Sequence, residues 1–233
     1  MGVRLLEGSG GASASVIYLL NFEGDDVGQI LAGVAGLRSA LVVVPVERWD
    51  EQMSPWPAES PYGKGACFPG GAPSFIDELL GRVMPEAETQ LGLRSPVRAL
   101  AGYSLAGLFA LWALASRPDA LTGAASCSGS LWYPGWTTWL EENAPQLAGH
   151  AVYLSLGSRE SRAKNPLVAR VGERTDQTAG LLRALGAEVR HEANPGGHFT
   201  DVPGRISRGL ASLDALLVSC RGAGKGRRLR PTC

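Results

Sequence analysis

The sequence predicts an α/β fold, a three-layer sandwich in which helices cover both faces of one mostly parallel central sheet. Short apolar runs of strand length recur along the chain, as in strands that are buried on both faces. Segments with helical periodicity separate these runs from one end of the chain to the other. Strand and helix patterns that alternate in this way are typical of a parallel sheet wrapped by helices.

The first strand, helix and strand form the clearest unit. Residues 15–21 are a continuous apolar run, and residues 40–46 are another. Between them, Asp25 and Asp26 precede apolar residues that recur every three or four positions up to Leu37, which predicts an amphipathic helix. A strand, a helix and a strand within about 30 residues indicate a βαβ unit with parallel strands.

The next part of the chain contains a long segment before the second helix. Residues 47–73 are rich in Pro and Gly and hold several aromatic residues. A connection of this length in one domain is expected to have a function. Residues 75–91 return to a helical period, and Pro85 is expected to interrupt or kink that helix.

The remaining elements follow the same alternation. Every strand is followed by a polar or Gly-rich loop, which is where α/β folds place their functional side chains. The helix after the strand at 97–101 is apolar on nearly every face and should be buried. The other expected elements are strands at 121–128, 151–156 and 188–193, and helices at 168–185 and from about 200 to 218.

Composition is consistent with one globular domain over residues 1–220. The 233 residues are 45% hydrophobic and 19% charged, and 22 Lys and Arg balance 22 Asp and Glu, so nothing indicates a nucleic-acid partner. Residues 221–233 hold five basic residues and no acidic one, which leaves 17 basic against 22 acidic residues and a net charge of −5 in the body. We expect this basic segment to be a flexible tail.

The cysteines and the N-terminus favour a cytoplasmic protein. The four cysteines are far apart and lack the spacing of a metal site or a disulfide framework, so no metal is expected. We recognise no secretory or myristoylation signal and no uninterrupted apolar stretch of about 18 residues, so no membrane association is expected. No cofactor is predicted, and the oligomeric state is left open.

A strand, a sharp turn around Ser104 and a helix form the most informative motif. The turn has the sequence Gly-Tyr-Ser-Leu-Ala-Gly over residues 102–107. This layout is typical of a nucleophile elbow, in which small residues allow a tight turn and the Ser hydroxyl stands clear of the backbone. The amide of Leu105, at the start of the helix, would then be available to an oxyanion.

An acid and a base follow Ser104 at the ends of two later strands. A Ser hydroxyl is a weak nucleophile, so a His must accept its proton and an acid must orient that His. Of the three His, His198 alone lies in a Gly-rich loop at the expected end of the sheet. Glu160 follows the preceding strand and is the candidate acid. Its rivals are Glu173, Asp176 and Asp201.

At this point the sequence resembles the Putative esterase family of α/β-hydrolases, which includes esterase D-like and siderophore esterase-like enzymes. The resemblance covers about residues 14–218 and depends on the strand at 15–21, the elbow at 102–107, Leu-Ser-Leu-Gly-Ser-Arg-Glu at 154–160 and Pro-Gly-Gly-His-Phe at 195–199. It implies a second oxyanion donor, the backbone amide of Phe22 or of Glu23. Some relatives of this type use a Ser–His dyad, so a role for Glu160 stays open.

The resulting hypothesis is a cofactor-free serine esterase that cleaves a small carboxylic ester through an acyl-enzyme. A thioesterase or acyltransferase with the same site, and a catalytically silent binding protein with this fold, are the alternatives. Trp56, Trp132 and Tyr103 are candidates for a substrate pocket near the elbow. The alternative for the aromatic residues is simple packing of a lid onto the body.

Overall fold

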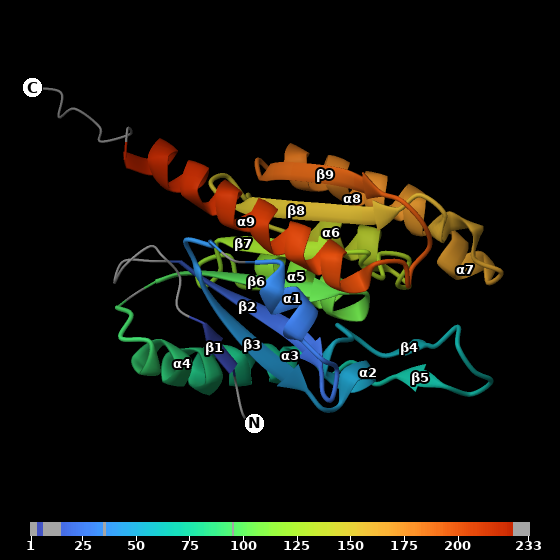
Figure 1. The fold of residues 1–233 in the computed structure, drawn as a ribbon. Coiled ribbons are helices and arrows are strands. Elements are labelled where there is room, and N and C mark those ends of the chain that lie inside the picture. The colour runs from blue at the N-terminus through green and yellow to red at the C-terminus, as the bar shows by residue number, and fades with distance from the viewer. Residues whose placement is uncertain (1–3, 7–14, 35, 95, 226–233) are drawn as a thin grey trace, which may run out of the picture.

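A seven-stranded sheet forms the centre of the computed structural model, which describes residues 4–6, 15–34, 36–94 and 96–225 (Figure 1). Its strand order is β1-β3-β2-β6-β7-β8-β9; β1 pairs antiparallel with β3, and all other neighbours are parallel. The predicted mostly parallel sheet is therefore confirmed. The strands are β1 (Arg4–Leu6), β2 (Ser15–Phe22), β3 (Ala40–Val46), β6 (Val97–Tyr103), β7 (Gly123–Cys127), β8 (Ala151–Gly157) and β9 (Glu188–Asn194).

Helices cover both faces of the sheet, as predicted. In Figure 1, α1 and α9 lie in front of the sheet, and α3, α4, α5, α6 and α8 lie behind it. The helical elements before the elbow are α1 (Gly28–Ala32), α2 (Trp49–Gln52), α3 (Ala72–Glu78), the π-helical turn η1 (Leu79–Val83) and α4 (Met84–Gln90). Those after it are α5 (Leu105–Ser116), α6 (Trp136–Asn143), the 3₁₀ turn η2 (Glu160–Arg162), α7 (Pro166–Ala169), α8 (Val171–Ala184) and α9 (Val202–Lys225).

The alternation of side chains along the strands divides the core into two parts. Tyr18 and Leu20 of β2 point toward the face that carries α5, whereas Ile17 and Leu19 point toward α1 and α9. All four side chains are at most 2% exposed. A strand buried on both faces must be apolar throughout, which explains the continuous run at the start of the sequence.

Several elements differ in detail from their predicted bounds. α1 is much shorter than the helix expected from Asp25 to Leu37. Gly33 is its C-cap residue, and a Cβ there would lie 2.6 Å from Ser207 Oγ of α9, so α9 packs closely at this end of α1. Before Pro85, which cannot donate a backbone hydrogen bond, the helix changes to the π form. The segment at 47–73 contains α2 and a small hairpin of β4 (Ala58–Glu59) and β5 (Cys67–Phe68).

The end of the chain differs from expectation as well. α9 continues to Lys225, so the expected boundary at residue 221 falls within this helix. The rest of the expected tail, residues 226–233, lies outside the described residues. None of the helices in the described part of the chain has both the length and the apolar character needed to cross a bilayer.

Candidate active site

Ser104 lies at the sharp turn between β6 and α5. Its backbone has φ 56° and ψ −120°, a conformation that residues other than Gly rarely adopt. The turn is so tight that a Cβ on Gly102 would lie 2.5–2.6 Å from atoms of Ala106. This observation accounts for the small residues on both sides of the Ser in the sequence.

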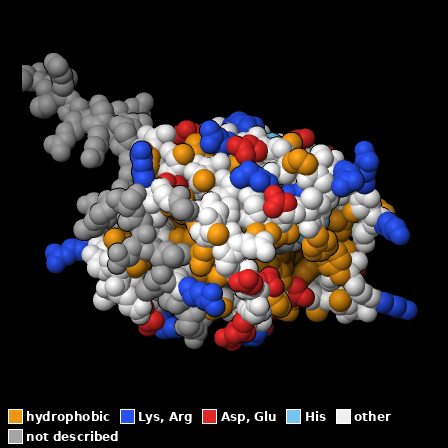
Figure 2. Space-filling view, viewed as in Figure 1, with side chains coloured by type: hydrophobic (Ala, Val, Ile, Leu, Met, Phe, Trp, Pro, Cys, Tyr) orange, Lys and Arg blue, Asp and Glu red, His pale blue; other side chains and the backbone are white. Residues whose placement is uncertain are grey.

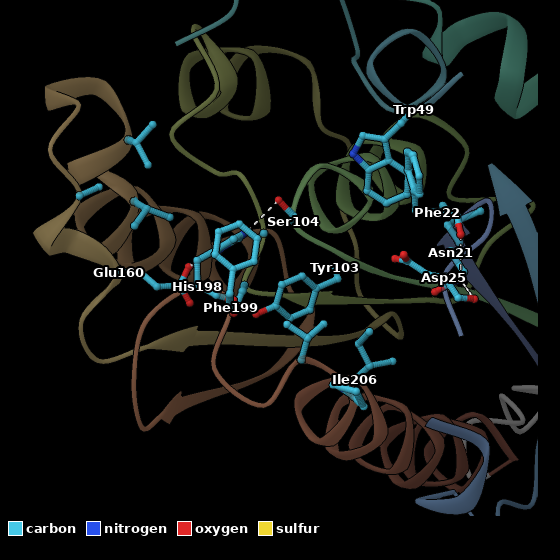
Figure 3. Close-up of a pocket in the computed structure, with 18 of the residues that line it drawn as sticks. Asn21, Phe22, Asp25, Trp49, Tyr103, Ser104, Glu160, His198, Phe199 and Ile206 are labelled. Carbon is cyan, nitrogen blue, oxygen red and sulfur yellow. Dashed lines mark hydrogen bonds and ion pairs between the residues drawn. The ribbon is translucent and has the colours of Figure 1, made fainter. Parts of the chain in front are cut away.

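The structure brings Ser104, His198 and Glu160 together, although each follows a different strand (Figure 3). His198 Nε2 lies 3.0 Å from Ser104 Oγ, and His198 Nδ1 lies 2.7 Å from Glu160 Oε2. The rival acids lie elsewhere. Glu173 pairs with Arg170 on the surface, and Asp201 pairs with Arg208.

Asp176, the third rival, lies 3.8 Å from His191, not near His198. The two other His are also away from Ser104. His191 belongs to β9, and the His150 ring contacts the backbone carbonyl of Pro118. Among the three His of the chain, His198 is therefore the one that contacts Ser104.

Glu160 is buried and charged. Its side chain is only 4% exposed, and burial alone would raise its pKa. The hydrogen bond and charge of His198 and the amide of Gly157, which donates to Oε1 over 2.7 Å, outweigh burial and lower the pKa below its ordinary value. The carboxylate is thus ionised near neutral pH and can accept a hydrogen bond from His198.

The predicted oxyanion donors are backbone amides of Leu105 and of Phe22 or Glu23. Leu105 is the first residue of α5, so its amide has no acceptor within the helix. The Glu23 amide already donates to Val46 O over 3.1 Å, toward β3. Because successive amides of a strand point to alternate neighbours, the Phe22 amide faces β6, where the pairing of β2 and β6 ends at Leu20 and Gly102. Of the two predicted donors, the Phe22 amide is therefore the one expected on the β6 side of β2.

A cavity of about 990 Å³ opens above Ser104. Phe22 and Trp49 lie on one side of it, and Glu160, His198 and Phe199 on the other (Figure 3). In Figure 2, hydrophobic side chains gather in a hollow on this face of the molecule, with acidic side chains beside it. Among the described residues, three large hydrophobic side chains are exposed, and all three line the cavity. They are Phe22 (46% exposed), Tyr62 (69%) and Phe199 (89%).

The aromatic residues proposed from the sequence divide into two groups. Trp132 and Tyr103 line the cavity, as does Trp49. Trp56 does not, because its indole donates to Pro134 O and packs against Tyr133 and Trp139. Trp56 therefore packs the long segment at 47–73 onto the body of the protein, which was the alternative to a role in the substrate pocket.

Two groups near the site were not identified from the sequence. Ser130 Oγ lies 3.3 Å from Ser104 Oγ, and the buried Arg205 contacts Glu160. Arg205 could have been noticed in the sequence, because it is a charged residue among the apolar positions of the last predicted helix. Ser130 had no comparable signal.

The described residues include no group of three or more His, Cys, Asp or Glu side chains that could hold a metal ion. Cys67, Cys127 and Cys220 are free thiols, and Cys233 lies outside the described residues. Burial raises the pKa of the Cys127 thiol to about 12, so this Cys is protonated at neutral pH.

The sheet order, the elbow and the loops at the strand ends define an α/β-hydrolase fold. Residues 10–199 match the family model described as Putative esterase, and the chain belongs to this family. A relative, the uncharacterized protein YbbA of Bacillus subtilis, is 27% identical over 146 residues, which are 62% of this chain and 58% of that protein. The chain thus matches less than two thirds of the length of this relative.

Solved structures support the same fold. An IroE-like serine hydrolase from Shewanella oneidensis superposes with a TM-score of 0.76 at 18% identity, covering 97% of this chain and 82% of that one. The siderophore hydrolase EstA from Aspergillus nidulans superposes with a TM-score of 0.64 at 23% identity, covering 92% and 89%. At these identities the likeness concerns the fold.

Proposed function

We propose that this protein is a serine esterase that cleaves a carboxylic ester through an acyl-enzyme intermediate. The observation that carries the proposal is the continuous contact from Ser104 Oγ through the His198 ring to the Glu160 carboxylate, at 3.0 and 2.7 Å. These distances allow the proton transfers that general base catalysis requires. Membership of an esterase family supports the same reaction.

The first half of the reaction acylates Ser104. Ser104 Oγ attacks the ester carbonyl carbon while His198 Nε2 accepts its proton. The amides of Leu105 and Phe22 donate to the oxyanion of the tetrahedral intermediate, and Glu160 stabilises the imidazolium. When the intermediate collapses, His198 returns its proton to the departing alcohol and the acyl group stays on Ser104.

The second half hydrolyses the acyl-enzyme. A water molecule takes the place of the alcohol, and His198 Nε2 accepts one of its protons as the water oxygen attacks the acyl carbon. Collapse of this second intermediate breaks the bond to Ser104 Oγ, which recovers a proton from His198. The products are a carboxylic acid and the free enzyme, with no cofactor consumed.

The cavity favours an ester with an apolar or aromatic part. Its lining includes Phe22, Trp49 and Trp132, and Phe199 projects into solvent beside His198. Apolar surface of this kind lowers the free energy of a bound substrate by about 25 cal/mol for each Å² of apolar surface buried. We therefore expect longer acyl chains to bind more tightly than acetate.

Turnover of nitrophenyl esters tests this proposal. We expect hydrolysis of nitrophenyl acetate, butyrate and octanoate, with kcat/KM rising from acetate to butyrate. Ser104→Ala should abolish turnover, and a fluorophosphonate should label the wild-type protein at Ser104. Ser116→Ala, at the far end of α5, is the matched control and should keep full activity.

Three outcomes would contradict the proposal. Turnover that survives in Ser104→Ala would place the nucleophile elsewhere. Label on another residue would do the same. No turnover and no label in a folded wild-type protein would favour a hydrolase-fold binding protein instead.

A further inference from the structure

Arg205 is a buried cation that the proposed reaction does not use. It lies in the first part of α9, and its side chain is 0% exposed. It does not line the cavity. Its guanidinium has four acceptors within hydrogen-bond distance. The two N–H groups of Nη1 are shared among Glu160 Oε1 (3.0 Å), Ser128 Oγ (3.0 Å) and Tyr103 Oη (3.2 Å), and Nη2 donates to Pro195 O (2.7 Å).

The four acceptors come from four different strand ends. Tyr103 ends β6 and precedes Ser104, Ser128 follows β7, and Glu160 follows β8. Pro195 follows β9 in the loop that leads to His198. One guanidinium therefore joins the loops that hold all three residues of the proposed triad.

A second contact strengthens this link to the His. The Tyr103 hydroxyl accepts from Arg205 and donates to the backbone carbonyl of His198. The 195–198 loop is thus held at two carbonyls, one directly by Arg205 and one through Tyr103. The Nε atom of Arg205 is buried and has no hydrogen-bond partner among the described residues, so the charge is stabilised through its two Nη atoms. Because a buried charge is costly unless it is paired, loss of any of these Nη contacts would be unfavourable.

We propose that Arg205 is a positioning residue that fixes Glu160 and the His198 loop in the geometry that ester cleavage needs. The inference rests on the proposed roles of Ser104, His198 and Glu160. Arg205 shares the carboxylate with His198: Oε2 faces the imidazole, and Oε1 receives Arg205 and the Gly157 amide. Its hydrogen bonds therefore hold the carboxylate in the orientation that directs Oε2 at His198.

The packing around this contact is tight at Gly157. A Cβ there would lie 2.6 Å from Gly196 O, 2.7 Å from Glu160 Oε1 and 2.8 Å from Arg205 Nη2. The β8 and β9 loops, Glu160 and Arg205 can approach one another this closely because residue 157 has no side chain.

Arg205 differs from the other charged side chains around the site. Apart from Glu160, those that line the cavity or follow the His198 loop are exposed, so water screens their charges: Asp25, Asp26, Arg159, Arg162, Asp201 and Arg208. Arg205 is buried and its charge is screened much less, so its replacement should disturb the site more than replacement of an exposed Arg.

The test compares Arg205→Met, Arg205→Lys and the control Arg208→Met. Arg208 lies one turn further along α9 and pairs at the surface with Asp201. For nitrophenyl butyrate we expect Arg205→Met to lower kcat at least tenfold with little change in KM. Arg208→Met should match the wild type in both kcat and KM.

Arg205→Lys separates charge from geometry. Lys keeps the buried charge but cannot reach four acceptors with a planar fork. We expect kcat to stay at least tenfold below the wild-type value, with little change in KM. If Arg205→Met does not fold, this variant decides the matter, and a wild-type kcat in Arg205→Lys would overturn the proposal.

Other results would also contradict the proposal. A folded Arg205→Met with the wild-type kcat would show that Arg205 positions nothing. A variant that raises KM as much as it lowers kcat would reduce Arg205 to a packing role. Turnover and labelling of the wild-type protein test the esterase itself, whereas the Arg205 variants test the positioning role, so failure of one proposal is distinguishable from failure of the other.

Discussion

Glu160 is the residue whose role the structure makes easiest to test. The Gln side chain in Glu160→Gln can still accept from Arg205 and Gly157 with its oxygen, but it then presents an NH₂ group to His198 Nδ1. Two donors cannot share a hydrogen bond, so the ring would have to adopt the wrong tautomer for accepting the Ser104 proton. We expect kcat to fall by roughly 10³-fold.

Steady-state kinetics with nitrophenyl butyrate measure this effect, and circular dichroism checks that the variant folds. Glu173→Gln, on the exposed face of α8, is the matched control and should keep the wild-type rate. A wild-type rate in Glu160→Gln would indicate that the site works as a Ser–His dyad.

At the scale of single residues, the sequence allowed prediction of those whose chemistry and position are both distinctive. Ser104, His198 and Glu160 each follow a strand, in an order typical of the fold, and the structure brings them together. Arg205 and Ser130 could not be predicted, because their contacts depend on how distant loops pack. Trp56 was predicted to line the pocket and does not. An aromatic residue in a long irregular segment gives no indication of whether its side chain faces the cavity or the core.

At the scale of elements, the elbow depends on a Gly that has no room for a side chain. Gly102→Ala would place a Cβ 2.5–2.6 Å from Ala106, so β6 and α5 would have to separate. We expect a loss of about 2 kcal/mol or more in the free energy of unfolding, together with most of the activity. Chemical denaturation and the ester assay measure the two effects.

Gly180→Ala is the control for this substitution. Gly180 lies within α8, and a Cβ there would have no neighbour within 4 Å. Ala is the better helix former, so we expect a gain of about 0.5–1 kcal/mol in stability and an unchanged rate. Equal effects of the two substitutions would contradict the steric explanation of the elbow.

Strands were more predictable than helices at this scale. The run at 40–46 matches β3 residue for residue, because a strand buried on both faces has a sharp compositional boundary. The helix expected from Asp25 to Leu37 is present only as α1. The apolar residues that follow α1 lie in turns, and their side chains belong to the same buried cluster as those of α9. A periodic pattern shows which side chains are buried, but it does not distinguish a helix from an irregular turn.

At the scale of the whole molecule, the buried Glu160 makes stability depend on pH. Its folded pKa lies below the ordinary value of 4.5, so the ionised form is favoured in the folded state. The contribution to stability is therefore fully present above that ordinary value and is lost as the pH falls through the lower folded pKa. We expect the wild type to be more stable than Glu160→Gln at neutral pH.

Thermal unfolding of both proteins between pH 7 and pH 3 measures this dependence. The difference in Tm should be constant from pH 7 to about pH 5 and shrink below 4.5. A difference that stays constant down to pH 3 would mean that Glu160 contributes through packing and not through its charge.

The place of Arg205 in the chain has a consequence for the order in which the site can be completed. Ser104, Glu160 and His198 are all present once residue 198 has been made, but the guanidinium that joins their loops comes from the helix that follows. During synthesis, the proposed triad would therefore lack this connection between its loops until α9 has emerged and docked on the sheet. The proposed activity would then depend on a helix that contributes no residue to the triad.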